Sequence, residues 1–267
     1  MKKIDYIQTL LQLTTLPLEL CELIVYHIHT YTFKTRDELK IAVQKYADNI
    51  NENIYGDCNW WDVSHITDMS CMFEHSPFNG DISQWDVSHV TNMRWMFFDS
   101  KFDSDISNWD VSSVTDMYSM FYQSKFNKSM SNWDVSNVIN MSYMFFDSKF
   151  DSDISNWDVS HVTDMRYLFA SSNFNQDISN WNVSNVNTMV CMFNDTCFNN
   201  DISHWNVSNV TNMYAMFCSS KFNNDISNWN VSRVTYMDCI FELCNFTGDI
   251  SNWNINSKIT NTMMYNF

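Results

Sequence analysis

A tryptophan recurs every 24 residues along most of this 267-residue chain, and this strict repeat constrains the fold more than any other feature. Eight full units occupy residues 61–252, and a ninth begins at Trp253 and loses its register after Ser257. A fixed period of this length is typical of proteins in which each repeat buries its apolar face against its neighbours. We therefore divide the chain into an N-terminal segment, 1–59, and a repeat region, 60–267. The recurring residues are Trp61, Trp85, Trp109, Trp133, Trp157, Trp181, Trp205, Trp229 and Trp253.

Two shorter periodicities lie inside each unit. Met93, Met96 and Phe97 follow the i, i+3, i+4 spacing of one helical face, and Thr91 precedes them in the position of an N-cap. The stretch 82–87, with apolar residues at its first, fourth and sixth positions, has the spacing of a corner that leads into a short strand. The sequence thus predicts an α/β repeat solenoid with leucine-rich-repeat-like coils, each made of one short strand and one short helical turn.

The turns of this chain cannot depend on glycine or proline. Only 3 Gly and 2 Pro occur in the sequence, so few turns can use a left-handed glycine or a φ fixed by proline. We expect Asn, Asp and Ser to make the turns instead.

Phrases inside the repeat resemble a known family. The stretches 78–88, Phe-Asn-Gly-Asp-Ile-Ser-Gln-Trp-Asp-Val-Ser, and 90–93, Val-Thr-Asn-Met, resemble the units of the BspA-like leucine-rich-repeat surface proteins. The segment 33–56 is similar to the helical segment that often precedes the first repeat, and Leu39, Ala42 and Val43 lie at helical spacing within it. The resemblance therefore implies an α-helical N-terminal cap.

The resemblance also implies possible roles. Better-known family members are bacterial surface adhesins that bind host or matrix proteins, whereas similar repeats occur in intracellular proteins of unicellular eukaryotes and large DNA viruses. Lys2 and Lys3 are not followed by an apolar run long enough for a signal peptide. We therefore expect a cytoplasmic repeat scaffold that binds another protein, and the alternative is an adhesin on a cell or virion surface.

The N-terminal segment contains a second resemblance. Leu16, Pro17, Leu20 and Ile24 fall in a phrase, 16–24, that resembles the opening of an F-box, by which adaptors dock onto a ubiquitin ligase. The resemblance makes a substrate adaptor of a ubiquitin ligase a second alternative function. A short apolar helix that begins with proline is the alternative, since proline is common at the first helical position. Too few residues precede the cap for the remaining helices of an F-box.

Charge and hydropathy exclude two classes of partner. The net charge is −16 and the isoelectric point is near 4.5, which argues against nucleic acid, because affinity for phosphates comes from Lys and Arg. No run of 18 apolar residues occurs, so we predict no membrane-spanning helix.

The eight cysteines show no Cys-x-x-Cys pair and no zinc-like spacing, which favours free thiols.

The sequence offers no catalytic constellation. His65, His89 and His161 share one repeat position without an accompanying nucleophile or glycine-rich loop, so we interpret them as surface turn residues and predict no enzyme and no cofactor.

A column of aspartates follows the tryptophans, and either bound Ca²⁺ or hydrogen bonds from Ser and Asn would let such charges lie close together. The column changes to Asn at Asn182, so the coil does not require a carboxylate there.

Specificity in a repeat protein must come from positions that differ between coils. The residues two and five places after the first Met of each unit lie off the Met-Met-Phe face of a helical turn, where they would face solvent. Aromatic residues cluster at these positions in coils two to five. Exposed aromatic side chains are common interface anchors, and packing between adjacent turns is the alternative. The predicted partner-binding residues are Trp95, Phe98, Tyr122, Tyr143, Phe146 and Tyr167.

Overall fold

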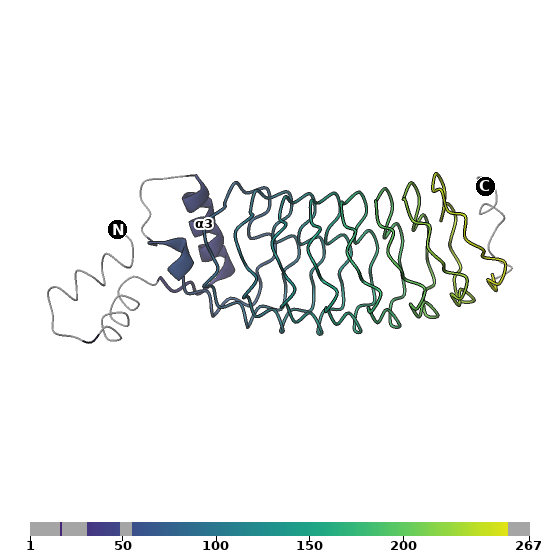
Figure 1. The fold of residues 1–267 in the computed structure, drawn as a ribbon. Coiled ribbons are helices and arrows are strands. Elements are labelled where there is room, and N and C mark those ends of the chain that lie inside the picture. Colours follow the sequence, from purple (N-terminus) through teal and green to yellow (C-terminus); the bar gives the residue numbers. More distant parts are fainter. Residues whose placement is uncertain (1–16, 18–30, 49–54, 256–267) are drawn as a thin grey trace.

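The computed structural model describes residue 17, residues 31–48 and residues 55–255, and it shows a long row of stacked coils (Figure 1). Helix α3 (Arg36–Ala47) lies at the N-terminal end of the row, and the 3-10 helix η1 (Cys58–Trp60) follows it. These are the only helices in the described residues. We number the coils by their repeat units: 61–84, 85–108, 109–132, 133–156, 157–180, 181–204, 205–228 and 229–252.

The predicted fold class, an α/β repeat solenoid with one strand and one helical turn per coil, is wrong. In the described residues, neighbouring coils are joined by isolated parallel β-bridges, and no strand or helix forms within a coil. The stretch expected to be a strand is two turns, because Trp85 N–H donates to the Ile82 carbonyl at 3.1 Å and Val90 N–H donates to the Val87 carbonyl at 2.9 Å. Both bonds join residues three apart, as in a β-turn.

The expected helical turn is also built from β-turns. Met96 N–H donates to the Met93 carbonyl, three residues earlier, at 3.2 Å. Trp95 and Asp99 have φ values of 54° and 43°, in the left-handed region that a right-handed helix cannot contain. Thr91 is not an N-cap, since its hydroxyl donates to a carbonyl of the previous coil at 3.3 Å. The Met-x-x-Met-Phe spacing therefore reports successive tight turns.

These turns direct their backbone donors toward the next coil. Met93 and Trp95 N–H donate to the carbonyls of Asp116 and Tyr118 at 3.0 and 2.9 Å, and Phe97 and Asp99 N–H continue the pattern. The same four bonds recur at each of the seven junctions between coils 1 and 8, at 2.7–3.2 Å. The N–H groups of Met96 and Phe98, which lie between these donors, bond within the coil, so the backbone is satisfied partly within each coil and partly by the next one.

The core consists of columns of identical side chains. The rings of Phe73 and Phe97 stack at 5.1 Å between centroids, and those of Trp85 and Trp109 stack at 6.5 Å. Buried Trp109 donates from Nε1 to the carbonyl of Ile82, 27 residues earlier, at 3.1 Å, and the later tryptophans repeat this bond. Each indole thus fills the interior and gives a second hydrogen bond to a carbonyl that also accepts the N–H bond closing a turn.

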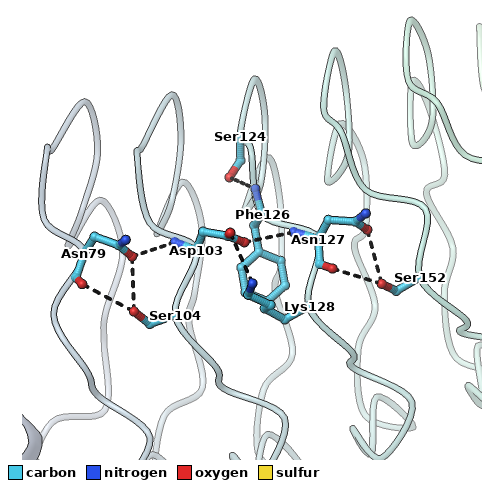
Figure 2. Close-up of polar contacts among 8 residues, drawn as sticks. All are labelled: Asn79, Asp103, Ser104, Ser124, Phe126, Asn127, Lys128 and Ser152. Atoms are coloured by element: carbon cyan, nitrogen blue, oxygen red, sulfur yellow. Dashed lines mark hydrogen bonds and ion pairs between the residues drawn. The ribbon is translucent and has the colours of Figure 1, made fainter.

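Polar side chains link the coils at the surface (Figure 2). Asn79 Oδ1 accepts from Asp103 N–H at 2.8 Å, and Asp103 Oδ1 accepts from Asn127 N–H at 3.4 Å. The Asp103 carboxylate also pairs with Lys128 Nζ at 3.3 Å. Asn, Asp and Ser therefore do the turn and junction chemistry that the shortage of glycine predicted.

Helix α3 lies against the first coil. Its buried residues Leu39, Ala42 and Val43 confirm the helix that their spacing predicted. Arg36 donates from Nε to the Ser70 carbonyl at 3.0 Å. In the other coils the equivalent carbonyl accepts from the preceding coil, so the guanidinium of α3 takes that donor's place at the first coil.

Candidate protein-interaction surface

All six predicted aromatic residues come together along one side of coils 2–5. Phe98, Tyr122 and Phe146 form a stack in which neighbouring ring centroids are 4.7 Å apart, and Tyr143 stacks on Tyr167 at 4.5 Å. The two stacks touch, since Phe146 and Tyr167 lie 6.0 Å apart. Every ring in the two stacks is half-buried. Each ring therefore shares part of its surface with a neighbour and keeps part in solvent.

Tyr118 is a further member that sequence reasoning missed. Its ring centroid lies 5.5 Å from that of Trp95 and 5.7 Å from that of Tyr143, so it joins Trp95 to the two stacks. Its repeat position directly follows the first Met and varies as much between coils as the two positions that were considered, a signal that could have revealed it. We call the set the aromatic ladder: Trp95, Phe98, Tyr118, Tyr122, Tyr143, Phe146 and Tyr167.

The aromatic residues were interpreted either as exposed interface anchors or as side chains that pack between adjacent turns, and their half-buried rings have features of both. The rings pack between adjacent coils, and offset or edge-to-face ring pairs contribute about 0.5–1.5 kcal/mol beyond the area they bury. Trp95, Tyr143 and Tyr167 also have left-handed φ values of 54°, 59° and 56°, which aromatic residues rarely adopt. The bonds from their N–H groups to the next coil hold that conformation.

The ladder also holds cations from its own chain. The guanidinium carbon of Arg94 lies 4.5 Å from the Tyr118 ring centroid and 5.4 Å from that of Trp95, within the range of a cation–π contact. Arg94 Nη1 pairs with Asp116 at 2.9 Å, and Arg166 Nη2 pairs with Asp164 at 2.8 Å. On this surface a carboxylate and two aromatic rings thus bind the same guanidinium group, that of Arg94.

Partial burial changes the titration of the ladder tyrosines. Burial, followed by the nearby charge of Asp147, raises the pKa of the Tyr122 hydroxyl, and burial also raises the pKa of Tyr143. A hydrogen bond with the Cys191 thiol, followed by burial, raises the pKa of Tyr167. The raised pKa values keep all three hydroxyls protonated at neutral pH, and those of Tyr122 and Tyr143 can donate hydrogen bonds to a partner.

The other candidate sites have simpler environments. His65, His89 and His161 are exposed turn residues, as predicted. Asp110 Oδ1 accepts from Ser112 N–H at 3.1 Å and from its hydroxyl at 2.6 Å, and the other members of the aspartate column accept from the equivalent serines. In the described residues, no three His, Cys, Asp or Glu side chains lie close enough together to hold a metal ion.

The structure describes only part of the residues on which the F-box and cysteine predictions rest. Leu16, Leu20 and Ile24 of the F-box-like phrase lie outside the described residues, and Pro17 is described and exposed. The seven cysteines in the described ranges are all free, with Cys58 and Cys191 buried. No helix in these ranges is long and apolar enough to cross a bilayer.

The described architecture defines a repeat protein, made of stacked 24-residue coils with an aromatic surface on one side. Comparison with protein families assigns it further. The chain matches the model of the family described as "Mycoplasma protein of unknown function, DUF285" over residues 38–150, 102–197, 123–218 and 194–267, and it belongs to that family. This supports a repeat-containing family related to the BspA-like proteins, without placing the chain among the surface adhesins. No curated protein and no solved structure matches the chain.

Proposed function

We propose that this chain is a non-enzymatic repeat scaffold that binds another protein through the aromatic ladder. The observation that carries the proposal is the gathering of seven half-exposed aromatic side chains on one side of coils 2–5. Tyr and Trp supply large contact areas at a low cost in side-chain entropy, and they dominate the energetics of many protein interfaces.

The coil itself does not require these aromatic residues. In coil 7, Ala215 and Cys218 occupy the positions that Trp95 and Phe98 occupy in coil 2. Ala215 N–H nevertheless donates to the next coil at 2.9 Å, the same distance as for Trp95 N–H. A surface that the backbone does not need is free to serve recognition.

The proposal includes a cytoplasmic location. Free thiols are usual in a reducing compartment, and the seven described cysteines suit one. Fractionation of the native cell, with detection of the chain by antibody, tests the location. Recovery in the cytosolic fraction is expected, and recovery on the cell surface would favour an adhesin.

The proposed function is tested with two pairs of substitutions in a tagged protein used to capture partners from the native cell. Trp95→Ala with Tyr143→Ala removes two ladder rings, and Asn132→Ala with Asn156→Ala removes two exposed side chains from another repeat position. A captured protein, once purified, should bind the aromatic variant at least about 30-fold more weakly than the wild type, or about 2 kcal/mol. It should bind the asparagine variant normally. Unchanged affinity for the aromatic variant, measured on its folded fraction, would refute this function.

A further inference from the structure

Four carboxylates lie along the aromatic ladder, and three of them already have a basic partner from this chain. Asp116 pairs with Arg94 at 2.9 Å, and Asp164 pairs with Arg166 at 2.8 Å. Asp99 Oδ2 lies 3.0 Å from Nδ1 of His75, whose ring meets the edge of Phe98 at 5.1 Å between centroids. The repeated combination is a carboxylate, a ring and a nitrogen-bearing side chain.

Asp147 is the fourth carboxylate, and its environment differs from that of the others. It is exposed, and its Oδ2 accepts from the neutral amide of Gln123 at 3.0 Å. Within the described ranges, no Lys, Arg or His nitrogen lies within ion-pair distance of it. Its charge nevertheless acts on the ladder, since it raises the pKa of the Tyr122 hydroxyl after the larger effect of burial.

The rings beside Asp147 end a stack. Asp147 directly follows Phe146, which stacks on Tyr122 at 4.7 Å. In the next coil Ala170 takes the position of Phe146, so the column of rings stops there, and Tyr167 approaches Phe146 only at a tilt of 60°. A half-buried ring beside a carboxylate resembles the setting in which this chain holds Arg94, with the difference that Asp147 is exposed and Asp116 is half-buried.

We propose that Asp147, Tyr122 and Phe146 form a site for an arginine side chain of the partner protein. This inference rests on the proposed function and names the chemistry of its partner. The guanidinium pairs with the Asp147 carboxylate, and the side-chain stem lies against the two rings, as cations and aromatic rings combine elsewhere on this ladder. Arginine suits the site better than lysine, because its planar head binds a carboxylate at two points and stacks on rings.

The charge of the whole chain favours the same kind of partner. The net charge is −16, so a basic segment is attracted over a long range, and an acidic segment is repelled. The specific claim is that the arginine of the partner binds at Asp147 and not at the acidic surface in general.

A matched pair of variants separates the two contributions. Asp147→Asn and Asp195→Asn remove one charge each from the same repeat position, and both residues are exposed with left-handed φ values of 48° and 53°. Asn tolerates this conformation, so both variants should fold. Asp195 follows Asn194 rather than a ring, and it accepts from the Ser171 hydroxyl at 3.4 Å.

The probe is a fluorescein-labelled peptide of alternating Arg and Gly, eight residues long, titrated into the full chain and followed by fluorescence anisotropy. Asp147→Asn should weaken binding at least about fivefold, and Asp195→Asn should change it by less than about twofold. A peptide of alternating Lys and Gly should bind more weakly than the arginine peptide. Equal losses in the two variants, or no binding by the wild type, would overturn the proposal.

A gain of binding provides an independent test. Arg94→Gln frees Asp116 and the neighbouring rings, so this variant should bind the arginine peptide more tightly or at a second site. Unchanged binding would contradict the idea that the ladder recognises guanidinium groups. If the captured partner depends on Trp95 and Tyr143 but ignores Asp147→Asn, the arginine site fails while the proposed function stands.

Discussion

Coils 2–5 and coils 6–8 share one backbone and one core but carry different surfaces. The four bonds between neighbouring coils, the left-handed residues and the columns of Phe and Trp continue through both regions. At the repeat positions of Trp95 and Phe98, however, coils 6–8 carry no aromatic residue, and at the position of Tyr118 only coil 7 does, with Tyr214. The residues at the first two positions are Cys191, Asn194, Ala215, Cys218, Cys239 and Glu242. The comparison separates what holds the coils together from what the surface can recognise.

The shared core should give the largest effects, and these should be equal in the two regions. Phe121 in coil 3 and Phe217 in coil 7 are both fully buried between stacked phenylalanines. Phe121→Ala and Phe217→Ala should each lower the free energy of unfolding by about 3–5 kcal/mol, because each leaves a cavity. Denaturant unfolding measures both. A loss below about 1 kcal/mol for one of them would show that the two cores differ.

Substitutions at the ladder positions should lower the free energy of unfolding more in coils 2–5 than in coils 6–8. Tyr122 is stacked between two rings, and Cys218 takes the same repeat position in coil 7. Tyr122→Ala should cost about 1–3 kcal/mol through lost ring contacts, whereas Cys218→Ala should cost less than about 0.5 kcal/mol. The same unfolding experiment applies. Equal costs would mean that the rings add nothing to stability.

The column of Asp in coils 1–5 and Asn in coils 6–8 predicts a difference in acid stability. Hydrogen bonds from Ser112 and Ser160 hold the pKa values of Asp110 and Asp158 below the ordinary 3.8. A carboxyl whose pKa is lowered by folding stabilises the fold above its unfolded pKa, and this contribution is lost as the pH falls. Asp110→Asn with Asp158→Asn should therefore reduce the fall in melting temperature between pH 5 and pH 3. At pH 7 the variant should differ from the wild type by less than about 0.5 kcal/mol. An unchanged pH profile would argue against these bonds in solution.

A further effect, smaller than that of the core substitutions, concerns a left-handed residue outside the ladder. Ser219 in coil 7 has φ 58°. Ser219→Gly should stabilise the chain by up to about 1 kcal/mol through relief of backbone strain, and the β-branched Ser219→Val should destabilise it by about 1–2 kcal/mol. Thermal unfolding of the two variants in parallel checks the sign. Greater stability of the valine variant would contradict the left-handed turn.

The repeat, the N-terminal helix and the gathering of the aromatic residues could all be predicted from sequence. Each depends on a spacing: 24 residues for the coil, helical spacing for Leu39 and Val43, and equivalent repeat positions for Trp95 and Tyr143. Equivalent residues in stacked repeats must lie near one another whatever the local backbone is. These predictions therefore survive an error in the secondary structure.

The local backbone could not be predicted in the same way. The Met93, Met96 and Phe97 spacing suits a helical turn, but successive β-turns also reverse the chain every few residues and bury the same side chains. The usual signal for a left-handed turn is glycine, and within residues 31–48 and 55–255 sixteen non-glycine residues adopt positive φ. In coils 1–7, bonds to the next coil hold these residues in place, and the sequence of a single repeat does not reveal those bonds.

The central claim is that the ladder serves recognition while the turns hold the coils, and one variant tests both halves together. Trp95→Ala, Phe98→Cys, Tyr143→Ala and Phe146→Cys give coils 2 and 4 the residues that coil 7 carries at those two repeat positions, Ala215 and Cys218. Hydrogen exchange by NMR should show the amides of the seven coil junctions still protected in the folded variant. Its affinity for the captured partner, measured at the same temperature, should fall at least about 30-fold. Protected amides with unchanged affinity would contradict the account.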